Sequence, residues 1–255
     1  TYPGFKALAQ TLHLEVLSVP VTDCGPDLNA LQKLCCSRSV RAVYSMPTLH
    51  NPLGWVMSLE QRQQLVAIAR THDLHIIEDA AYAFLVENPP LPIAELAPER
   101  TIYVSGLSKS VAAGLRVGFM AAPAHLIAAL ERVIRVTAWN TPGVMTSLAS
   151  AWLEDGTVSR LEVQKRQDAH ARQNIADELL AGLRTVRHPY SYFIWLPLSE
   201  DARAEQVVTA LMREHVSVSS AQPFATSSHV PRAIRLALGS VDLASLREGL
   251  AKVKW

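Results

Sequence analysis

The amino-acid sequence has few cysteines, little net charge and no long apolar run. Its cysteines are Cys24, Cys35 and Cys36, an odd number with an adjacent pair and no Cys-x-x-Cys motif, which favours reduced thiols over a disulfide framework. The net charge of +1 comes without a basic stripe, so we do not expect this chain to bind nucleic acid. The longest apolar stretches, Val117–Pro123 and Leu126–Leu130, are too short to span a bilayer. No charged-then-apolar leader opens the chain, and a cytoplasmic location is therefore expected.

Hydrophobic residues make up 49% of the 255 residues, which is enough for the core of one large domain or of two unequal ones. The histidines are scattered, and the closest pair, His72 and His75, straddles the predicted end of a helix and start of a strand. Because metal ligands must converge on one point, no metal site is predicted.

The first two-thirds of the chain alternates short β-rich runs with longer helical stretches. The predicted strands are Leu14–Val19, Ala42–Ser45, His75–Glu78, Thr101–Val104 and Gly118–Ala121. Three of them are nearly continuous apolar segments, which is typical of strands covered on both faces. Helices are predicted over Asp27–Leu34 and over Ser58–His72, where Ser58 and Gln61 have the spacing of a capping box. This alternation favours an α/β fold with a mostly parallel sheet covered by helices.

The pattern changes near residue 146. A long helix is predicted over Thr157–Leu183, because proline and glycine are absent until Gly182. Strands are then predicted over Tyr192–Leu196 and Ile234–Leu238, and helices over Ala204–His215 and Asp242–Val253. We therefore predict a large domain over residues 1–145, followed over residues 146–255 by a linking helix and a smaller C-terminal α/β domain.

Four groups of polar residues lie at or just after the ends of predicted strands, where open parallel sheets bind ligands. The first is Ser105-Gly106-Leu107-Ser108-Lys109, with Arg116 shortly after it. A lysine here can lie at the floor of a cleft, where desolvation and positive charge free its amine to attack a carbonyl. Arg116 has the planar fork that suits phosphate. The alternative is a surface lysine in a serine-containing turn, with Arg116 in a solvated ion pair.

The second group is Glu78, Asp79 and Tyr82, which follow the apolar pair Ile76-Ile77. A carboxylate buried at a strand end is costly unless a cation meets it. Asp79 is therefore a candidate partner for a cationic ligand nitrogen, and Tyr82 a candidate hydroxyl donor. The alternative is that Asp79 caps a helix.

The third and fourth groups each centre on one residue. Asn51 lies in the loop Pro47-Thr48-Leu49-His50-Asn51-Pro52-Leu53-Gly54, where the prolines and the glycine predict a tight turn and the amide can donate to a ligand oxygen. Arg235 lies in a predicted strand and is a candidate clamp for a carboxylate. The alternatives are an asparagine that bonds its own backbone and an arginine in a surface salt bridge.

The order of these groups resembles the class I/II aminotransferases of pyridoxal 5′-phosphate (PLP) fold type I. Asn-Pro-x-Gly, Asp-x-x-Tyr, Ser-Lys, a following Arg and a late Arg-Leu in a strand occur at similar intervals, and the resemblance covers essentially the whole chain. The Glu-Asp-x-x-Tyr and Ala-Gly-Leu-Arg-x-Gly motifs are most similar to those of the aminotransferase-like domain of MocR-type GntR regulators. The resemblance implies the PLP fold type I and PLP as cofactor.

By this resemblance, Lys109 corresponds to the lysine that holds PLP as a Schiff base and then moves the substrate proton. Asp79 corresponds to the partner of the pyridine nitrogen, and Asn51 and Tyr82 correspond to the two donors to the ring oxygen O3′. Ser108 and Arg116 correspond to phosphate-binding residues. Arg235 corresponds to the arginine that binds the substrate α-carboxylate.

The chain departs from the family pattern in two places. Family members usually have a hydroxyl residue three positions before the lysine, where this chain has Gly106, and Ser105 is one residue too early. The family also has a phosphate-binding helix N-terminus and a ring-stacking aromatic upstream of its Tyr-Pro-Gly region, whereas this chain opens near Tyr2-Pro3-Gly4. We therefore expect an N-terminally truncated large domain, as a fragment, a shortened product or part of a larger protein. A MocR-like parent would carry an N-terminal winged helix that could bind nucleic acid.

Three functions remain open at this point. The first is a PLP-dependent aminotransferase that moves an amino group between an amino acid and a 2-oxo acid, as a cytoplasmic homodimer. The second is a PLP- or amino-acid-sensing effector domain of a GntR/MocR-type transcriptional regulator. The third is an inactive truncated remnant that binds no cofactor.

Overall fold

The computed structural model describes residues 1–253, and the chain divides into two units. Unit 1 comprises Thr1–Ser18, Leu49–Trp55 and the chain from Arg166 onward. Unit 2 comprises Val19–Thr48 and Val56–Lys165. The predicted domain boundary between residues 145 and 146 stays a prediction.

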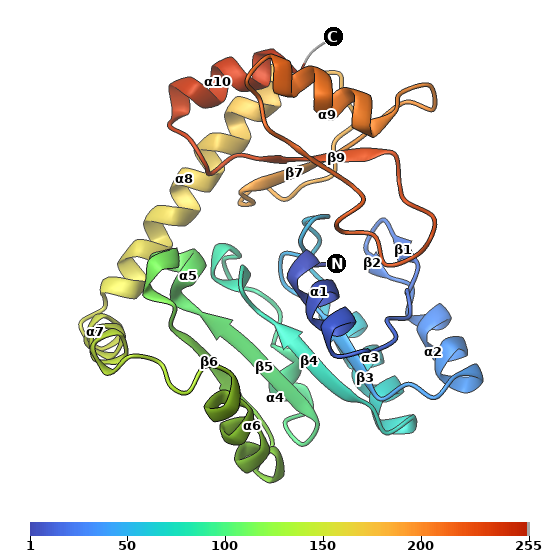
Figure 1. Cartoon of the computed structure of the whole chain (residues 1–255), viewed down its shortest axis with the longest axis vertical. Helices are drawn as coiled ribbons and strands as arrows, with labels where there is room; N and C mark the ends of the chain where they lie inside the picture. The colour runs from blue at the N-terminus through green and yellow to red at the C-terminus, as the bar shows by residue number, and fades with distance from the viewer. Residues whose placement is uncertain (254–255) are drawn as a thin grey trace. The chain divides into compact units, whose positions relative to one another are not determined.

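Unit 2 is built on a four-stranded sheet in the order β3-β4-β5-β6 (Figure 1). Its strands are β3 (Ala42–Ser45), β4 (His75–Asp79), β5 (Thr101–Gly106) and β6 (Gly118–Ala121). The first three run parallel, and β6 is antiparallel to β5. A parallel crossover takes about a dozen residues or more, and the connection Leu107–Val117 is too short for one, so β6 returns antiparallel. The predicted mostly parallel sheet is confirmed.

Three helices of unit 2 pack against one face of this sheet. They are α2 (Leu28–Ser37), α3 (Leu59–Thr71) and the short α4 (Ile93–Leu96). Leu31 and Leu65 from the helices and Ile76 from β4 belong to one buried apolar cluster. The predicted capping box is confirmed, because Ser58 and Gln61 bond each other's backbone amides at the start of α3. The helix-covered α/β architecture expected from the sequence is therefore present.

The remaining short elements and helices of unit 2 are β1 (Val21–Thr22), β2 (Gly25–Pro26), η1 (Ala83–Leu85), α5 (Leu107–Ser110), η2 (Ala113–Leu115), α6 (Ala124–Thr137) and α7 (Gly143–Glu154). The sequence analysis did not identify α6 or α7 as helices. Helix α8 (Thr157–Leu179) begins in unit 2 and continues into unit 1. It ends before the predicted Leu183, because Gly182 adopts a positive φ of 86°, a backbone conformation typical of helix ends.

The register of the parallel strands sorts the residues of β4 onto two faces. Ile76 and Glu78 are buried on the face that packs against the helices. Ile77 and Asp79 are half-buried, and alternation along the strand puts them on the opposite face. Tyr44 of β3 pairs with Ile77, and paired residues of neighbouring strands point to the same side. Tyr44 and Asp79 therefore share the face opposite α3.

The predicted strand Leu14–Val19 is wrong. Helix α1 (Pro3–Thr11) ends just before it, and the segment itself has no regular structure. A strand needs a neighbour to complete its hydrogen-bond ladder, and within residues 1–253 no strand pairs with this segment. Its contacts in unit 1 are of other kinds: the Leu14 amide donates to the carbonyl of Ala9 at 2.8 Å, and Ser18 Oγ donates to Thr226 Oγ1 at 2.9 Å.

Unit 1 contains a three-stranded antiparallel sheet in the order β7-β9-β8, with α8, α9 and α10 beside it (Figure 1). The elements not yet given are β7 (Phe193–Pro197), α9 (Ala204–Arg213), β8 (Ser219–Ser220), β9 (Ala233–Ala237) and α10 (Leu243–Ala251). Ile194 and Ile234 of the sheet, Ala176 of α8, Leu211 of α9 and Leu250 of α10 lie in one buried core. The strands and helices predicted for this part of the chain are confirmed. Within residues 1–253, no helix combines the length and apolar character that crossing a membrane requires.

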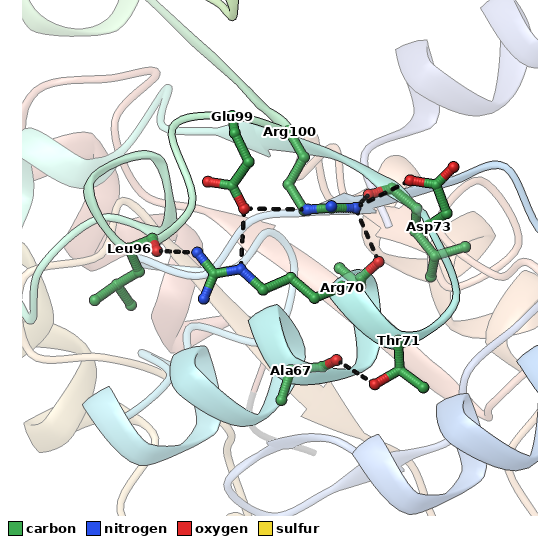
Figure 2. A network of polar contacts seen from close by, with 9 residues as sticks. Ala67, Arg70, Thr71, Asp73, Leu96, Glu99 and Arg100 are labelled. Atoms are coloured by element: carbon green, nitrogen blue, oxygen red, sulfur yellow. Dashed lines mark hydrogen bonds and ion pairs between the residues drawn. The ribbon is translucent and has the colours of Figure 1, made fainter.

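The end of α3 carries a network of ion pairs at the protein surface (Figure 2). Glu99 Oε1 accepts hydrogen bonds from Arg70 Nε at 2.9 Å and from Arg100 Nε at 3.2 Å. Arg70 also donates to the carbonyl of Leu96 at 3.0 Å, and Arg100 pairs with Asp73 at 3.5 Å. The hydrogen bond from Arg70, assisted by Arg100, lowers the pKa of Glu99 to about 2. The network ties the last turn of α3 to the connection between α4 and β5.

Candidate functional site

Asp79 is the last residue of β4, and both of its carboxylate oxygens accept hydrogen bonds. Oδ1 accepts from the backbone amide of Ala81 at 3.0 Å, and Oδ2 accepts from the hydroxyl of Tyr44. The bond to Ala81 is a local turn of the kind that a strand-end aspartate often makes. The bond from Tyr44 comes from a different strand. The carboxylate is therefore held from two sides rather than used only as a backbone cap.

Lys109 lies in α5, a single helical turn directly after β5. Leu107 and Ser110 are both 2% exposed, whereas Lys109 is exposed. The turn thus buries Leu107 and Ser110 and leaves Lys109 exposed, and the expectation that this lysine lies at the floor of a cleft stays a prediction. The Nζ atom of Lys109 lies 5.7 Å from the centre of the Tyr82 ring, a cation–π contact.

These residues lie at one edge of the unit 2 sheet. Strands β4 and β5 are parallel neighbours, with Asp79 paired to Val104, so their carboxyl ends meet at the same edge. Tyr82 follows β4 and Lys109 follows β5, and the contact between them joins the two connections. The structure thus brings Asp79, Tyr82 and Lys109 to one sheet edge. That the amine and the carboxylate meet opposite ends of one ligand stays a prediction.

The two candidate phosphate-binding residues lie on either side of η2 in the chain. Ser108 is half-buried in α5, and Arg116 is exposed with a positive φ of 52°. Within residues 1–253, the side chains of Lys109 and Arg116 make no hydrogen bond or ion pair. Two cationic groups close in the sequence are thus available to an anion.

Gly106 has a structural reason to lack a side chain. A Cβ atom built there would lie 2.8 Å from the carbonyl oxygen of Val117 and 3.1 Å from the Cα of Gly118. Both are backbone atoms, which cannot turn aside as a side chain could. The end of β5 and the start of β6 approach each other closely here, and the amide of Leu107 donates to the same Val117 carbonyl at 3.0 Å. The hydroxyl residue that the resemblance leads one to expect at position 106 would therefore force the backbone to move.

Asn51 and Arg235 meet in unit 1. Arg235 Nη1 donates to Asn51 Oδ1 at 3.0 Å, which leaves the amide nitrogen of this buried asparagine as its donor. The guanidinium carbon of Arg235 lies 5.0 Å from the ring centre of Phe224 and 5.8 Å from that of Phe193. Arg235 is thus oriented by an amide oxygen and two aromatic rings, and it lies within β9 as predicted.

The loop that carries Asn51 is held by its neighbours on both sides of that residue. The ring of buried His50 packs against Trp55 with ring centres 4.0 Å apart and planes tilted by 39°, and its Nδ1 accepts from the amide of Leu53 at 3.4 Å. Burial lowers the pKa of His50 well below its ordinary value, so this ring is neutral at physiological pH. Gly54 has a φ of 72°, and a Cβ there would lie 3.0 Å from the backbone of Arg187. These contacts explain the tight turn that the sequence predicted.

Two residues near the unit 2 site, Tyr44 and Arg62, were not identified from the sequence, and neither was the pairing of Arg62 with Glu78. Arg62 is 0% exposed and donates to the carbonyls of Met57, Leu91 and Pro47 and to Thr48 Oγ1, at 2.8–3.2 Å. Its Nη1 lies 3.9 Å from Glu78 Oε1, and burial raises the pKa of Glu78. The adjacent acids in Ile76-Ile77-Glu78-Asp79 were a signal that one of them faces the core, but nothing local identified its partner.

Comparisons with known proteins show the family to which the chain belongs. A family model described as "Aminotransferase class I and II" matches residues 1–253. The chain is 28% identical over 264 residues to 2-aminoadipate transaminase of Thermus thermophilus, covering 98% of this chain and 66% of the relative. It is 26% identical over 252 residues to the uncharacterized HTH-type transcriptional regulator YdeF of Bacillus subtilis, covering 98% of this chain and 54% of the relative.

Solved structures show the same fold. The crystal structure of LysN, the α-aminoadipate aminotransferase of Thermus thermophilus, superposes with a TM-score of 0.91 at 25% identity, over 99% of this chain and 68% of that one. An archaeal alanine:glyoxylate aminotransferase superposes with a TM-score of 0.90 at 25% identity, over 99% of this chain and 67% of that one. The chain therefore spans between about half and two-thirds of the length of the proteins that it matches.

Proposed function

Because this chain belongs to the aminotransferase class I and II family, we propose that it binds PLP and transfers an amino group from an amino acid to a 2-oxo acid. Its architecture is that of PLP fold type I, as the solved aminotransferases show. The single observation that carries the proposal is the meeting of Asp79, Tyr82 and Lys109 at the carboxyl edge of β4 and β5. A family match alone supports a fold, whereas this set of side chains supports the chemistry.

The unit 2 residues fit the chemical groups of PLP. A phosphate needs cations or N–H donors, and the Arg116 guanidinium and the Ser108 hydroxyl are within the same short stretch as Lys109. A pyridinium nitrogen needs an anionic acceptor, and each Asp79 oxygen has lone pairs left beside the hydrogen bond that it accepts from Tyr44 or Ala81. An aldehyde needs an amine, and Lys109 is exposed and outside any ion pair within residues 1–253.

Each proposed residue has a defined role toward the cofactor or the substrate. When bound, PLP supplies an aldehyde for the amine and a protonated ring that withdraws electrons from the reacting carbon. The Lys109 amine would hold the cofactor and would move the substrate proton as a general acid and base. Asp79 keeps the ring nitrogen protonated, and Tyr82 donates to O3′. Ser108 and Arg116 hold the phosphate.

Unit 1 is proposed to supply substrate recognition. The planar fork of Arg235 binds the α-carboxylate that amino acids and 2-oxo acids share. The contacts of Arg235 with Asn51 and Phe224 support this role, because a fork that is already oriented loses little freedom on binding. Asn51 is proposed to donate its amide nitrogen to O3′.

The test is the uptake of PLP by the wild-type chain, by Lys109→Ala and by the matched control Lys33→Ala, an exposed lysine on α2. After dialysis, the wild type and the control are expected to retain visible absorbance, and Lys109→Ala is expected to lose it. Borohydride reduction followed by mass spectrometry should then find the cofactor on Lys109. Visible absorbance that Lys109→Ala retains, or a wild type that retains none, would contradict the proposal.

A second candidate function is an effector domain that senses PLP or an amino acid in a transcriptional regulator. The observation that favours it is the similarity to YdeF, of which this chain spans 54%. Both functions use the same residues, so turnover separates them. Addition of an amino acid to the loaded protein should release 2-oxo acid in stoichiometric amount if the chain is an aminotransferase. A spectral change without release of 2-oxo acid would favour the effector domain.

A further inference from the structure

Tyr44 and Asp79 come from neighbouring parallel strands and meet on one face of the unit 2 sheet. Tyr44 pairs in register with Ile77, two residues before Asp79, so the two side chains are diagonal neighbours on the same face. Such neighbours lie about 7–8 Å apart at the backbone, within reach of a long aromatic side chain. The Tyr44 hydroxyl closes this gap and donates to Asp79 Oδ2.

We propose that Tyr44 is a positioning residue, which orients the Asp79 carboxylate toward the pyridinium nitrogen of the cofactor. The inference rests on the proposed function, because it names a second residue of the same site. The amide of Ala81 holds Oδ1 from the residue's own turn, at 3.0 Å, and Tyr44 holds Oδ2 from the adjacent strand. One donor on each oxygen fixes the rotation of the carboxylate about its Cβ–Cγ bond, which a single donor does not.

The position of Tyr44 suits this task. It lies in the sheet and is half-buried, so its ring has less freedom than a loop side chain would have. A phenol hydroxyl is a hydrogen-bond donor without formal charge, so it orients the carboxylate without neutralising it. Each carboxylate oxygen has two lone pairs, and one bond to each leaves further lone pairs for a ligand N–H.

The test is a double-mutant cycle on the PLP dissociation constant, with Tyr44→Phe, Asp79→Asn and the double variant, followed by tryptophan fluorescence. Loss of one hydrogen bond of ordinary strength predicts that Tyr44→Phe raises the dissociation constant about two- to tenfold. If Tyr44 acts through Asp79, the same change should have no further effect when residue 79 is already asparagine. Equal effects in both backgrounds would overturn the inference, because a merely structural role is independent of Asp79.

The matched control is Tyr103→Phe. Tyr103 is a half-buried tyrosine of β5 in the same sheet, and it pairs with Glu78, which puts it on the opposite face from Asp79. We expect the PLP dissociation constant of Tyr103→Phe to equal that of the wild type. A loss as large as that of Tyr44→Phe would overturn the inference, because removal of any sheet hydroxyl would then have the same effect.

A second readout is the pH dependence of the visible spectrum of bound PLP, which also decides the case if Asp79→Asn binds too weakly to titrate. A misoriented Asp79 stabilises the ring proton less, so Tyr44→Phe should lose this proton at a lower pH than the wild type and Tyr103→Phe. An unchanged pH profile in Tyr44→Phe would overturn the inference and leave the proposed function standing. A wild type that binds no PLP, or binds it without Lys109, would instead overturn the proposed function and the inference with it.

Discussion

Replacement of Arg62 by alanine is expected to lower the free energy of unfolding of unit 2 by about 3–5 kcal/mol, the usual cost of removing one partner of a buried ion pair. Arg62 is 0% exposed and lies 3.9 Å from the buried carboxylate of Glu78. That distance is long for an ion pair, so much of the effect should come from the hydrogen bonds. Their loss removes the Arg62 donors from three carbonyls and one hydroxyl, of which the Pro47 carbonyl keeps the Met57 amide at 2.8 Å. Each buried polar group that is left without a partner costs about 1–3 kcal/mol.

The same helix provides a matched control. Arg70 also lies in α3 and pairs with Glu99 (Figure 2). The two side chains are 51% and 46% exposed. Arg70→Ala should therefore cost about 0–1 kcal/mol, and because both variants replace arginine by alanine in one helix, the change in helix propensity is the same. Arg62→Lys should retain the charge but recover only part of the stability, because an ammonium lacks the planar fork that spans several carbonyls.

The assay is native-state hydrogen exchange at the β4 amides, which reports on unit 2, together with urea denaturation followed by circular dichroism. Protection at Ile76 and Glu78 should fall far more in Arg62→Ala than in Arg70→Ala. Equal losses in the two variants would refute the reasoning, because they would mean that burial of Arg62 does not determine its contribution.

Three further predictions concern the rest of the chain. Gly106→Ala should lower the free energy of unfolding by about 1–3 kcal/mol, the range for overpacking, because its Cβ would meet the Val117 carbonyl. Gly114→Ala should not lower it, because the space around Gly114 is open. Equal losses of stability in urea denaturation would contradict this explanation. The hydrogen bond from Arg70 lowers the pKa of Glu99 from 4.5 to about 2, so the contribution of this pair to stability is present above pH 4.5 and lost as the pH falls through about 2. The difference in unfolding free energy between the wild type and Glu99→Gln should therefore shrink over that range. A difference that stays constant would contradict the pairing. The homodimer that the resemblance implies predicts twice the monomer mass in light scattering, and a monomer at all concentrations would exclude it.

Much of the fold followed from patterns within single segments. The Ser58 and Gln61 spacing predicted a capping box that the structure contains, and apolar runs predicted β3, β4, β5 and β6 at their observed places. Candidate site residues at strand ends were readable for the same reason, because where a strand ends depends on local chemistry. The order of Asn51, Asp79, Lys109 and Arg235 along the chain was enough to indicate the family.

Where local patterns did not predict the structure, the contact that determined it was between segments distant in sequence. An apolar run becomes a strand only if another strand pairs with it, which Leu14–Val19 lacks within the described residues. Arg62 lies in a polar helix sequence, and only the packing of α3 against β4 makes it a buried donor to four acceptors.

The sequence by itself located the ends of the unit 2 strands β3–β6 to within two residues, and hence indicated which chemistry the sheet edge can offer. Only the tertiary structure decided which side chains meet there: Tyr44 reaches Asp79 because two parallel strands adopt one register, and Lys109 meets the ring of Tyr82. Strand register is set by packing over a whole face of the sheet. No local pattern contains that information, because each strand could alternate in the same way in any of several registers.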